Sequence, residues 1–253
     1  MATLNREGVD IYYEVHGDAS KPTILLSHGY SATSAMWQSQ VAALKDDYQV
    51  IVWDMRGHGA SASPADPAQY SEARTVEDMA ALLDQVGVEQ AIVGGLSLGG
   101  YMSLAFHATY PKRCSALMLF DTGPGYKSDT GRAAWNQTAE IRAQSFEQEG
   151  LAALGEGEEV RIAQHQSAAG LALAARGMLA QVNDRVIQSL PAVQVKTLVL
   201  VGDQDEPFIA PTNYMSGKIQ NAEQVVIKDA GHASNIDQPE AFNQAVIAFL
   251  NSL

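Results

Sequence analysis

The sequence lacks several features that define common classes of protein. Its 253 residues include one cysteine, Cys114, which excludes an internal disulfide framework and a metal site built from several cysteines. No run reaches the roughly 18 apolar residues of a membrane-spanning helix, and the first residues contain no apolar stretch typical of a signal peptide. Internal repeats and low-complexity tracts are also missing. We therefore expect a cytoplasmic protein that does not insert into a membrane.

Basic residues are scarce as well. The chain has 16 Lys and Arg against 29 Asp and Glu, which gives a formal net charge of −13 at pH 7. This balance argues against a broad basic face that binds nucleic acid or an anionic membrane. Hydrophobic residues make up 46% of the chain, so it can bury a large core. The length fits one large α/β domain, or a core with an insertion. The oligomeric state is not readable from these data.

Short apolar runs alternate with helical patterns along the chain. Residues 9–17 alternate in the manner of a strand with one buried face. Other apolar runs are continuous, which is typical of strands buried on both faces in parallel sheets. These runs open the segments 22–29 and 48–59 and recur in 91–97, 116–121, 197–203 and 223–232. The alternation predicts a parallel sheet covered by helices on both faces.

Helical periodicity fills most of the gaps between these runs. In residues 75–88, apolar side chains recur on one face, and Thr75 with Asp78 resembles a capping box. The strand-helix alternation breaks between residues 127 and 194, where no strand pattern occurs and Ala, Gln and Glu are frequent. We predict a core domain of residues 1–126 and 195–253, with residues 127–194 inserted in it as a helical cap.

The stretch Gly-Gly-Leu-Ser-Leu-Gly-Gly, residues 94–100, stands between an apolar run and a helical pattern. Glycine is costly inside regular structure, so four glycines around Ser97 indicate a backbone geometry that side chains would forbid. Strand, Gly-x-Ser-x-Gly and helix, in that order, form the nucleophile-elbow pattern. A phosphate-binding loop is less well supported because no Gly-Lys-Ser/Thr follows. On this motif alone, a glycine-rich turn with an incidental serine is the alternative.

A serine nucleophile needs a base and an acid. Of the six histidines, His232 is the one placed late enough for the chain order serine, acid, histidine. The segment after residues 197–203 offers Asp203, Asp205 and Glu206 as the carboxylate that orients the imidazole. Because parallel strands direct their C-terminal ends to one edge of the sheet, we expect these groups to meet there.

Over essentially its full length, the chain resembles the α/β-hydrolase superfamily, and within it the serine esterase and enol-lactonase branch. The resemblance rests on "SHGYS" (27–31), "DMRGHGAS" (54–61), "GGLSLGG" (94–100), "GDQDEPF" (202–208) and "GHASNIDQPEAF" (231–242). It implies an α/β fold with a mostly parallel central sheet of about eight strands, flanked by helices and carrying a small helical cap.

The resemblance also implies roles for individual residues. The family's Gly-x-x-Asp acid motif maps onto residues 202–205, which favours Asp205 over Asp203 as the acid. Asp121 is a less favoured substitute, because some members carry the acid at that position. The "DMRGHGAS" segment is expected to be structural, with Asp54, Arg56 and His58 fixing a turn behind the site.

The mechanism implied by the family is acyl transfer without a metal or organic cofactor, and no H-E-x-x-H metal motif occurs in the sequence. His232 would take the Ser97 proton as the serine oxygen attacks an ester carbonyl. The backbone N–H groups of Tyr30 and Leu98 would form the oxyanion hole. The expected partner is a small or medium carboxylic ester or lactone, cleaved through an acyl-enzyme.

Three large side chains, Trp37, Trp135 and Met178, are candidates to line an acyl or alcohol pocket, with core packing as the alternative. C–C bond hydrolases of ring-cleavage products and cofactor-free perhydrolases or haloperoxidases share the same triad and stay alternatives. Epoxide hydrolases and haloalkane dehalogenases are disfavoured, since they use an aspartate where this chain has Ser97. An alternative of another class is a non-catalytic ligand-binding receptor on the same scaffold.

Overall fold

An eight-stranded, mostly parallel sheet organises the protein, which a computed structural model describes over residues 2–253. Across the sheet the order is β1-β2-β4-β3-β5-β6-β7-β8. β2 pairs antiparallel with β1 and β4, and all other neighbours are parallel. The expected fold class is therefore confirmed. The strands are β1 Ala2–Arg6, β2 Val9–His16, β3 Thr23–Ser27, β4 Gln49–Trp53, β5 Ala91–Leu96, β6 Cys114–Phe120, β7 Thr197–Gly202 and β8 Ala222–Ile227.

The continuous apolar runs form the buried centre of the sheet. Every residue of β3, β4, β5 and β7 is buried, as expected for strands covered on both faces. The sequence pattern does not predict β1. All five residues of this edge strand are exposed or half-buried, so they carry no apolar signal.

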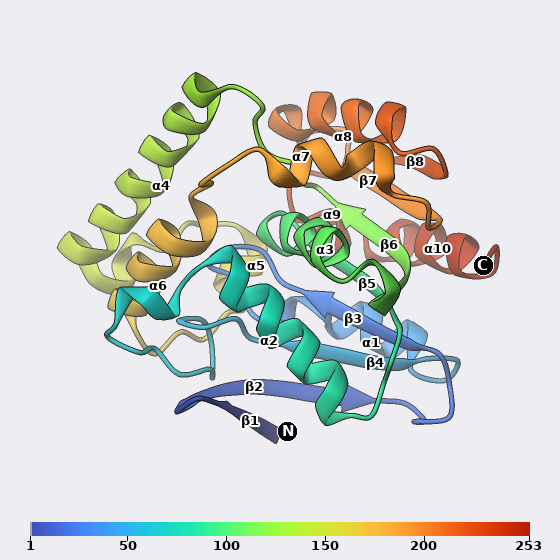
Figure 1. Cartoon of the computed structure of the whole chain (residues 1–253), viewed down its shortest axis with the longest axis horizontal. Coiled ribbons are helices and arrows are strands. Elements are labelled where there is room, and N and C mark those ends of the chain that lie inside the picture. Colours follow the sequence, from blue (N-terminus) through green and yellow to red (C-terminus); the bar gives the residue numbers. More distant parts are fainter. Residues whose placement is uncertain (1) are drawn as a thin grey trace.

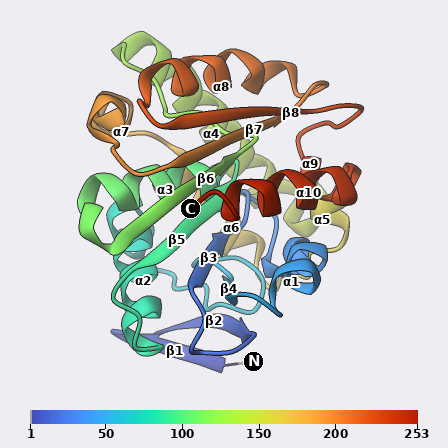
Figure 2. The same ribbon diagram turned by 90° about the vertical axis from the view of Figure 1, so that its right-hand side faces the viewer.

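Helices cover both faces of the sheet. Figure 2 shows α2 and α3 on one side and α1 and α10 on the other. Within residues 2–253, no helix combines the length and the apolarity that crossing a bilayer requires. The α-helices are α1 Gln38–Leu44, α2 Glu72–Gln85, α3 Leu98–Thr109, α4 Asp129–Glu149, α5 Glu158–Arg161, α6 Ala168–Ala174, α7 Arg185–Ser189, α8 Glu206–Lys218, α9 Ser234–Asp237 and α10 Pro239–Leu250. Short turns of other helix types are η1 Ser34–Trp37, η2 Pro67–Gln69, η3 Pro111–Arg113, η4 Gly150–Ala153, η5 Ala175–Leu179 and η6 Leu190–Ala192.

The core has one large apolar cluster on each face of the sheet and a smaller third cluster among α4, α6 and η5. Leu25 belongs to the cluster under α2 and α3, whereas its neighbours Ile24 and Leu26 belong to the cluster under α1 and α10, as alternation along a strand requires. In the second cluster, the rings of Phe120 and Phe242 pack edge to face at 4.7 Å. Burying each such side chain stabilises the fold by about 1.5–3 kcal/mol.

Helix α2 begins earlier than its sequence pattern indicates. The Ser71 hydroxyl oxygen accepts a hydrogen bond from the Arg74 N–H at 3.1 Å and so caps a helix that starts at Glu72. Thr75 lies inside the first turn, and its hydroxyl donates to the Ser71 carbonyl at 2.9 Å. The capping-box interpretation of Thr75 is therefore wrong, because an N-cap serine four residues earlier takes that position.

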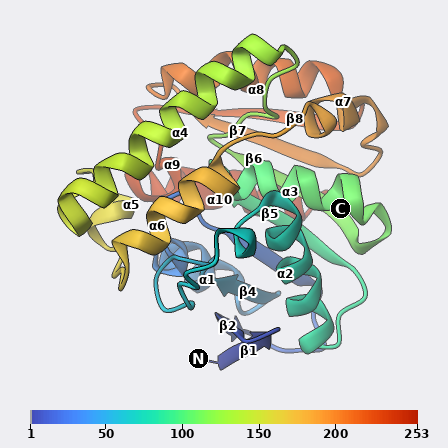
Figure 3. The ribbon, with the colours of Figure 1, turned by 60° about the vertical axis from the view of Figure 1, so that its left-hand side comes forward.

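The described chain between β6 and β7 consists of helices and turns, without a strand. α4 packs against α6 and η5, and Figures 1 and 3 show α4 and α6 side by side at one edge of the molecule. Arg176 of η5 forms ion pairs with Glu140 and Glu147 of α4 at 2.8 and 2.5 Å. α7 packs instead against α3 of the sheet-covering layer.

Candidate active site

Ser97 occupies the sharp turn between β5 and α3. Its backbone has φ 55° and ψ −117°, a strained conformation that costs of order 1–3 kcal/mol for a residue with a side chain. Close packing requires the glycines: a Cβ on Gly95 would lie 2.4 Å from the Gly99 carbonyl carbon, and one on Gly99 would lie 2.1 Å from the Ser27 oxygen. After β6, the Thr122 hydroxyl donates to the Ser97 carbonyl at 2.6 Å. The turn has the geometry of a nucleophile elbow.

His232 and Asp205 form a hydrogen-bonded pair. His232 lies on the loop after β8, and Asp205 lies on the turn between β7 and α8. The His232 Nδ1 atom is 2.8 Å from Asp205 Oδ2, so Nδ1–H donates to the carboxylate and the other ring nitrogen can accept a proton. Asp203 is exposed and accepts a hydrogen bond from the Ala230 N–H at 3.4 Å. Of the two neighbouring carboxylates, Asp205 is the one bonded to the imidazole.

The environment of His232 makes its imidazole more basic than usual. Burial lowers the pKa of His232, but the hydrogen bond and the charge of Asp205 raise it by more, with help from Asp121 and Glu159, so the net direction is upward. Phe208 stacks on the imidazole with ring centroids 4.9 Å apart and planes at 27°. Because Phe208 also lines a cavity together with Ser97, the imidazole lies beside the wall of that cavity.

Asp121 connects the two loops that carry His232 and Asp205. Its carboxylate accepts a hydrogen bond from the Gly202 N–H at 2.8 Å, at the end of β7, and another from the hydroxyl of Ser234, two residues after His232. Burial raises the pKa of Asp121 to about 7, while these hydrogen bonds act in the opposite direction. Both oxygens of the Asp121 carboxylate are thus engaged in hydrogen bonds to these loops. The imidazole of His232 is hydrogen-bonded to Asp205 and not to Asp121.

The loop after β3 lies against the Ser97 turn. A Cβ on Gly29 would be 3.5 Å from Ser97 Cβ, which brings the next residue, Tyr30, close to the serine. Leu98 is the first residue of α3, so its N–H has no partner within the helix. The Tyr30 hydroxyl donates to the Leu171 carbonyl of α6 at 2.9 Å and anchors the loop. The oxyanion hole formed by Tyr30 and Leu98 stays a prediction.

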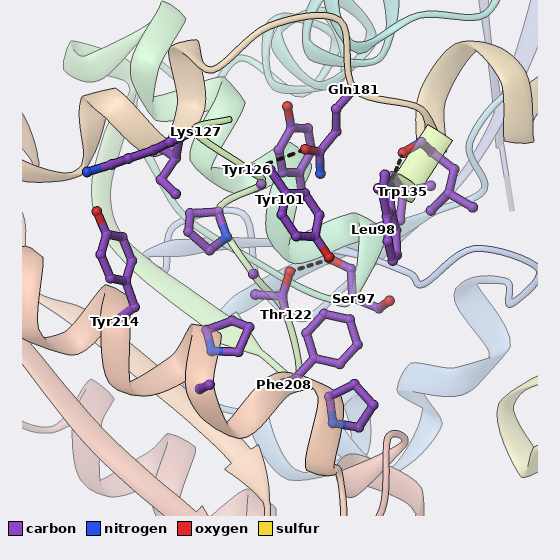
Figure 4. A pocket seen from close by; sticks show the side chains of 18 of the residues that line it. Ser97, Leu98, Tyr101, Thr122, Tyr126, Lys127, Trp135, Gln181, Phe208 and Tyr214 are labelled. Carbon is purple, nitrogen blue, oxygen red and sulfur yellow. Dashed lines mark hydrogen bonds between the residues drawn. The ribbon is translucent and has the colours of Figure 1, made fainter. Parts of the chain in front are cut away.

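A cavity of about 510 Å³ opens above Ser97, between the sheet and the inserted helices. Trp135 of α4 and Phe208 of α8 form parts of its wall, and the Trp135 indole N–H donates to the Leu179 carbonyl at 2.8 Å. Figure 4 shows Ser97 and Phe208 next to each other in this cavity. Its other lining residues are Leu98, Tyr101, Thr122, Gly123, Pro124, Gly125, Tyr126, Lys127, Ser128, Leu179, Gln181, Ile187, Pro207, Ala210, Pro211 and Tyr214.

The structure places the three expected pocket residues differently. Trp135 lines the cavity, but Trp37 is buried against Phe120 on the α1–α10 face, and Met178 belongs to the core cluster on the opposite face. The expectation is wrong for Trp37 and Met178 because the core also takes up large apolar side chains, and composition does not distinguish the two environments. Phe208 was missed, although it lies three residues after the expected acid, Asp205.

Three other histidines pack against one another. The His58 ring lies 5.0 Å from that of His28 and 5.8 Å from that of His165. Both ring nitrogens of His28 and of His165 form hydrogen bonds with backbone groups. His58 Nδ1 donates to the Arg56 carbonyl, and the buried His58 Nε2 has no hydrogen-bond partner within the described chain. Burial lowers the pKa of all three. Arg56 forms a buried ion pair with Asp78 at 2.6 Å. These contacts fit a structural role for the "DMRGHGAS" segment.

The strand order, the strained serine turn after β5 and the polar loops beyond β7 and β8 define a protein of the α/β-hydrolase class. The chain belongs to the α/β hydrolase fold family, whose sequence profile matches residues 22–168. The resemblance predicted from the five sequence segments is thus confirmed.

Relatives cover nearly the whole chain. 3-Oxoadipate enol-lactonases 2 and 1 of Acinetobacter baylyi are 30% and 31% identical in alignments that cover 98% of this chain and 96% of each relative. Among solved structures, an esterase from Thermogutta terrifontis has a TM-score of 0.83 at 30% identity and covers 99% of this chain and 96% of its own. The enol-lactonase from Burkholderia xenovorans has a TM-score of 0.79 at 26% identity, over 99% and 100%. The relatives named here are hydrolases.

Proposed function

We propose that the protein is a serine hydrolase that cleaves a small or medium carboxylic ester or lactone through an acyl-enzyme. Ser97 is the nucleophile, His232 the base and Asp205 the acid that orients it. One observation carries this proposal: the strained turn presents Ser97 to a cavity whose Phe208 wall stacks on the imidazole that Asp205 holds. The esterase and enol-lactonase relatives support ester or lactone chemistry.

The proposed reaction has two halves. His232 takes the Ser97 proton as the serine oxygen bonds to the substrate carbonyl carbon, and the carbonyl electron pair moves onto its oxygen. The N–H groups of Tyr30 and Leu98 stabilise that oxyanion, and each such donor contributes about 3 kcal/mol. The bond to the leaving oxygen then breaks, and this oxygen takes the proton from His232. Water repeats the sequence with His232 as base and releases the acid.

The form of the cavity supports a compact substrate. Its wall is largely apolar, with Trp135, Leu98, Ile187 and Phe208 among the lining residues, which suits burial of a short hydrocarbon portion of an ester. We therefore expect activity to be greatest for short acyl groups in a chain-length series of 4-nitrophenyl esters. Highest activity on long, emulsified esters would contradict this part of the proposal.

A serine-directed fluorophosphonate probe tests the nucleophile directly. The wild-type protein should be labelled once, and Ser97→Ala should lose the label together with esterase activity. Ser216→Ala is a suitable control, because Ser216 of α8 lies outside the cavity lining and should leave both unchanged. A folded wild-type protein that binds ligands without labelling would identify a non-catalytic receptor and contradict the proposal.

A substrate panel separates the remaining alternatives on the same fold. Esters, lactones, vinylogous diketones and a perhydrolysis assay with acetate and hydrogen peroxide are compared, with the Ser97→Ala protein as the blank. We expect esters or lactones to give the highest kcat/KM. A higher value for a diketone would indicate C–C bond cleavage, and activity confined to the peroxide assay would indicate a perhydrolase.

A further inference from the structure

The end of β6 lies between the segments that carry Ser97 and Asp205. β6 pairs with β5, which leads to Ser97, on one side and with β7, which leads to Asp205, on the other, and Figure 2 shows it between them. The Phe120 carbonyl accepts a hydrogen bond from the Ser97 N–H at 2.9 Å, and the Thr122 hydroxyl bonds the Ser97 carbonyl, as Figure 4 shows. Asp121, between Phe120 and Thr122 in the chain, therefore lies next to the turn of the proposed nucleophile.

Asp121 combines backbone strain with a buried carboxylate. Its φ is 45°, in the left-handed region that residues with a side chain seldom adopt, and its side chain is buried. Strain of this kind is concentrated at functional sites. A buried carboxylate needs hydrogen-bond donors, and the donors here are the Gly202 N–H on Oδ1 and the hydroxyl of Ser234, itself buried, on Oδ2.

Asp121 and the imidazole of His232 also interact through their charges. The charge of Asp121 raises the pKa of His232, and the charge of His232 lowers the pKa of Asp121. Two carboxylates thus act on one imidazole, but only one of them, Asp205, accepts its Nδ1–H. The other is bonded to Ser234, two residues after His232 in the chain.

The loop of the proposed base has further anchors besides Ser234. The Gly231 N–H donates to the Asp237 carboxylate at 2.8 Å, and the Asn235 side-chain amide donates to the Met36 carbonyl at 2.8 Å. Neither of these bonds engages the two carboxylates near the imidazole. Removing the Ser234 hydroxyl therefore leaves these anchors in place and changes the partners of Asp121.

We propose that Ser234 is a positioning residue that assigns the acid role to Asp205. Its hydroxyl engages Oδ2 of Asp121, so Asp205 is the carboxylate left to bond the imidazole of His232. Without this hydroxyl, Asp121 competes with Asp205 for the Nδ1–H. The inference rests on the proposed function for the chemistry at Ser97, but the partner of the Nδ1–H can be observed without turnover.

A reversal of sign between two backgrounds tests this role by kinetics. In the wild-type protein, Ser234→Ala should lower kcat for a short 4-nitrophenyl ester about fivefold and leave KM within about twofold, because two carboxylates then compete to orient the base. In the Asp205→Asn protein, the same change should instead raise kcat about tenfold, because the released Asp121 bonds the imidazole. A hydroxyl that merely stabilises the loop would give a lower kcat in both backgrounds, and that result overturns the proposal.

Three further variants make the kinetic test specific. Ser234→Cys keeps the shape of the side chain with a weak donor and should change kcat in the same two directions by smaller factors, so it replaces alanine if that variant unfolds. Thr75→Val removes another buried hydroxyl, on α2, and should change kcat less than twofold in either background. Adding Asp121→Asn to the Asp205→Asn/Ser234→Ala protein should abolish the gain. A gain that survives this third substitution would refute the role given to Asp121.

Proton NMR of the His232 Nδ1–H provides a readout that does not depend on activity. An imidazole N–H bonded to a carboxylate resonates far downfield of the backbone amides, because the hydrogen bond is charge-assisted, and His232→Gln identifies the signal by its loss. We expect the signal in the wild-type protein, its loss in Asp205→Asn and its return in Asp205→Asn/Ser234→Ala. If the signal follows this pattern but the wild-type protein cleaves no ester, the proposed function fails and the role of Ser234 stands. Ester hydrolysis that needs Ser97, with neither a gain in kcat nor a returning signal in the double variant, refutes the role of Ser234 alone.

Discussion

His232 and the group of His28, His58 and His165 show how differently one kind of side chain behaves in two parts of this protein. His232 donates to the buried Asp205 carboxylate, and its pKa is raised although burial acts against this. The other three hydrogen-bond to backbone groups, and burial lowers the pKa of each, although the charge of Asp54 acts upward on His28 and His165. A carboxylate hydrogen-bonded to the imidazole offsets desolvation, whereas backbone partners and the charge of Asp54 do not.

This difference in pKa distinguishes His232, which can exchange protons, from the three buried histidines, which support the fold. A histidine held neutral by burial can donate through one nitrogen and fill space, but it takes up a proton with difficulty at neutral pH. An imidazole supported by a carboxylate stabilises the positive charge that forms when it accepts a proton. Although His28 and His58 also follow strands of the sheet, His232 is therefore the proposed base.

The largest predicted effect comes from removing the carboxylate partner of His232, which leaves His232 without a charged hydrogen-bond partner, like the other three histidines. Asp205→Asn removes the charge that raises the pKa of His232 and leaves burial, which lowers it. We expect kcat for a short ester to fall by roughly 10⁴, the typical cost of this change in a catalytic triad. Because the base works in its neutral form, the acidic limb of the kcat/KM profile should also move to lower pH.

Asp203→Asn is the matched control for this prediction. Asp203 is the exposed neighbour of Asp205 in sequence, and its carboxylate is bonded to a backbone N–H outside the imidazole pair. Activity and the pH profile of this variant should stay within a fewfold of wild type. Equal losses in both variants would mean that general negative charge, and not the bonded carboxylate, distinguishes His232.

An intermediate effect is expected at Asp121, the second carboxylate near His232. Asp121→Asn keeps the shape of the side chain but leaves one acceptor oxygen for two donors, since the Gly202 N–H bonds Oδ1 and the Ser234 hydroxyl bonds Oδ2. We expect kcat/KM to fall about tenfold, with the acidic limb moved slightly to lower pH, because Asp121 also raises the pKa of His232. Steady-state rates from pH 5 to 9 measure both changes. A loss as large as that of Asp205→Asn would make Asp121 a full alternative acid.

The contrast between these residues also shows what could be predicted from the sequence. Ser97 and His232 stand in short motifs whose spacing after apolar runs reflects local backbone requirements, so the fold class, the nucleophile and the base could be identified from the residues. The choice of Asp205 among its neighbouring carboxylates came from the resemblance to the α/β-hydrolase superfamily. The bond between Asp121 and Ser234 joins residues 113 positions apart, and no local pattern encodes it. Trp37 and Trp135 have the same chemistry, and only the folded structure assigns one to the core and the other to the cavity.

The smallest predicted effect is on the pH dependence of stability, and it tests the buried histidines through His58. The folded-state pKa of His58 is lowered well below 6.5, so the unfolded chain binds this proton more readily than the folded one. Stability is then lost as the pH falls from about 6.5 toward the folded-state pKa and is regained as the pH rises. The groups that face His58 include the His28 and His165 rings, whose pKa values burial also lowers, and the Tyr30 ring.

His58→Asn removes this titration and keeps a donor for the Arg56 carbonyl, to which His58 Nδ1 is bonded. The decrease in Tm between pH 7.5 and pH 5.0 should shrink by about 2–4 °C, the shift that 1 kcal/mol produces in a domain of this size. Raised pKa values at His232 and Asp121 act with the opposite sign, but they are common to both proteins and cancel in the comparison. Any cavity left by the substitution lowers Tm at both pH values alike. A decrease with pH identical to that of wild type would show that His58 is protonated in the folded state, and the distinction between the two kinds of histidine would then rest on location alone.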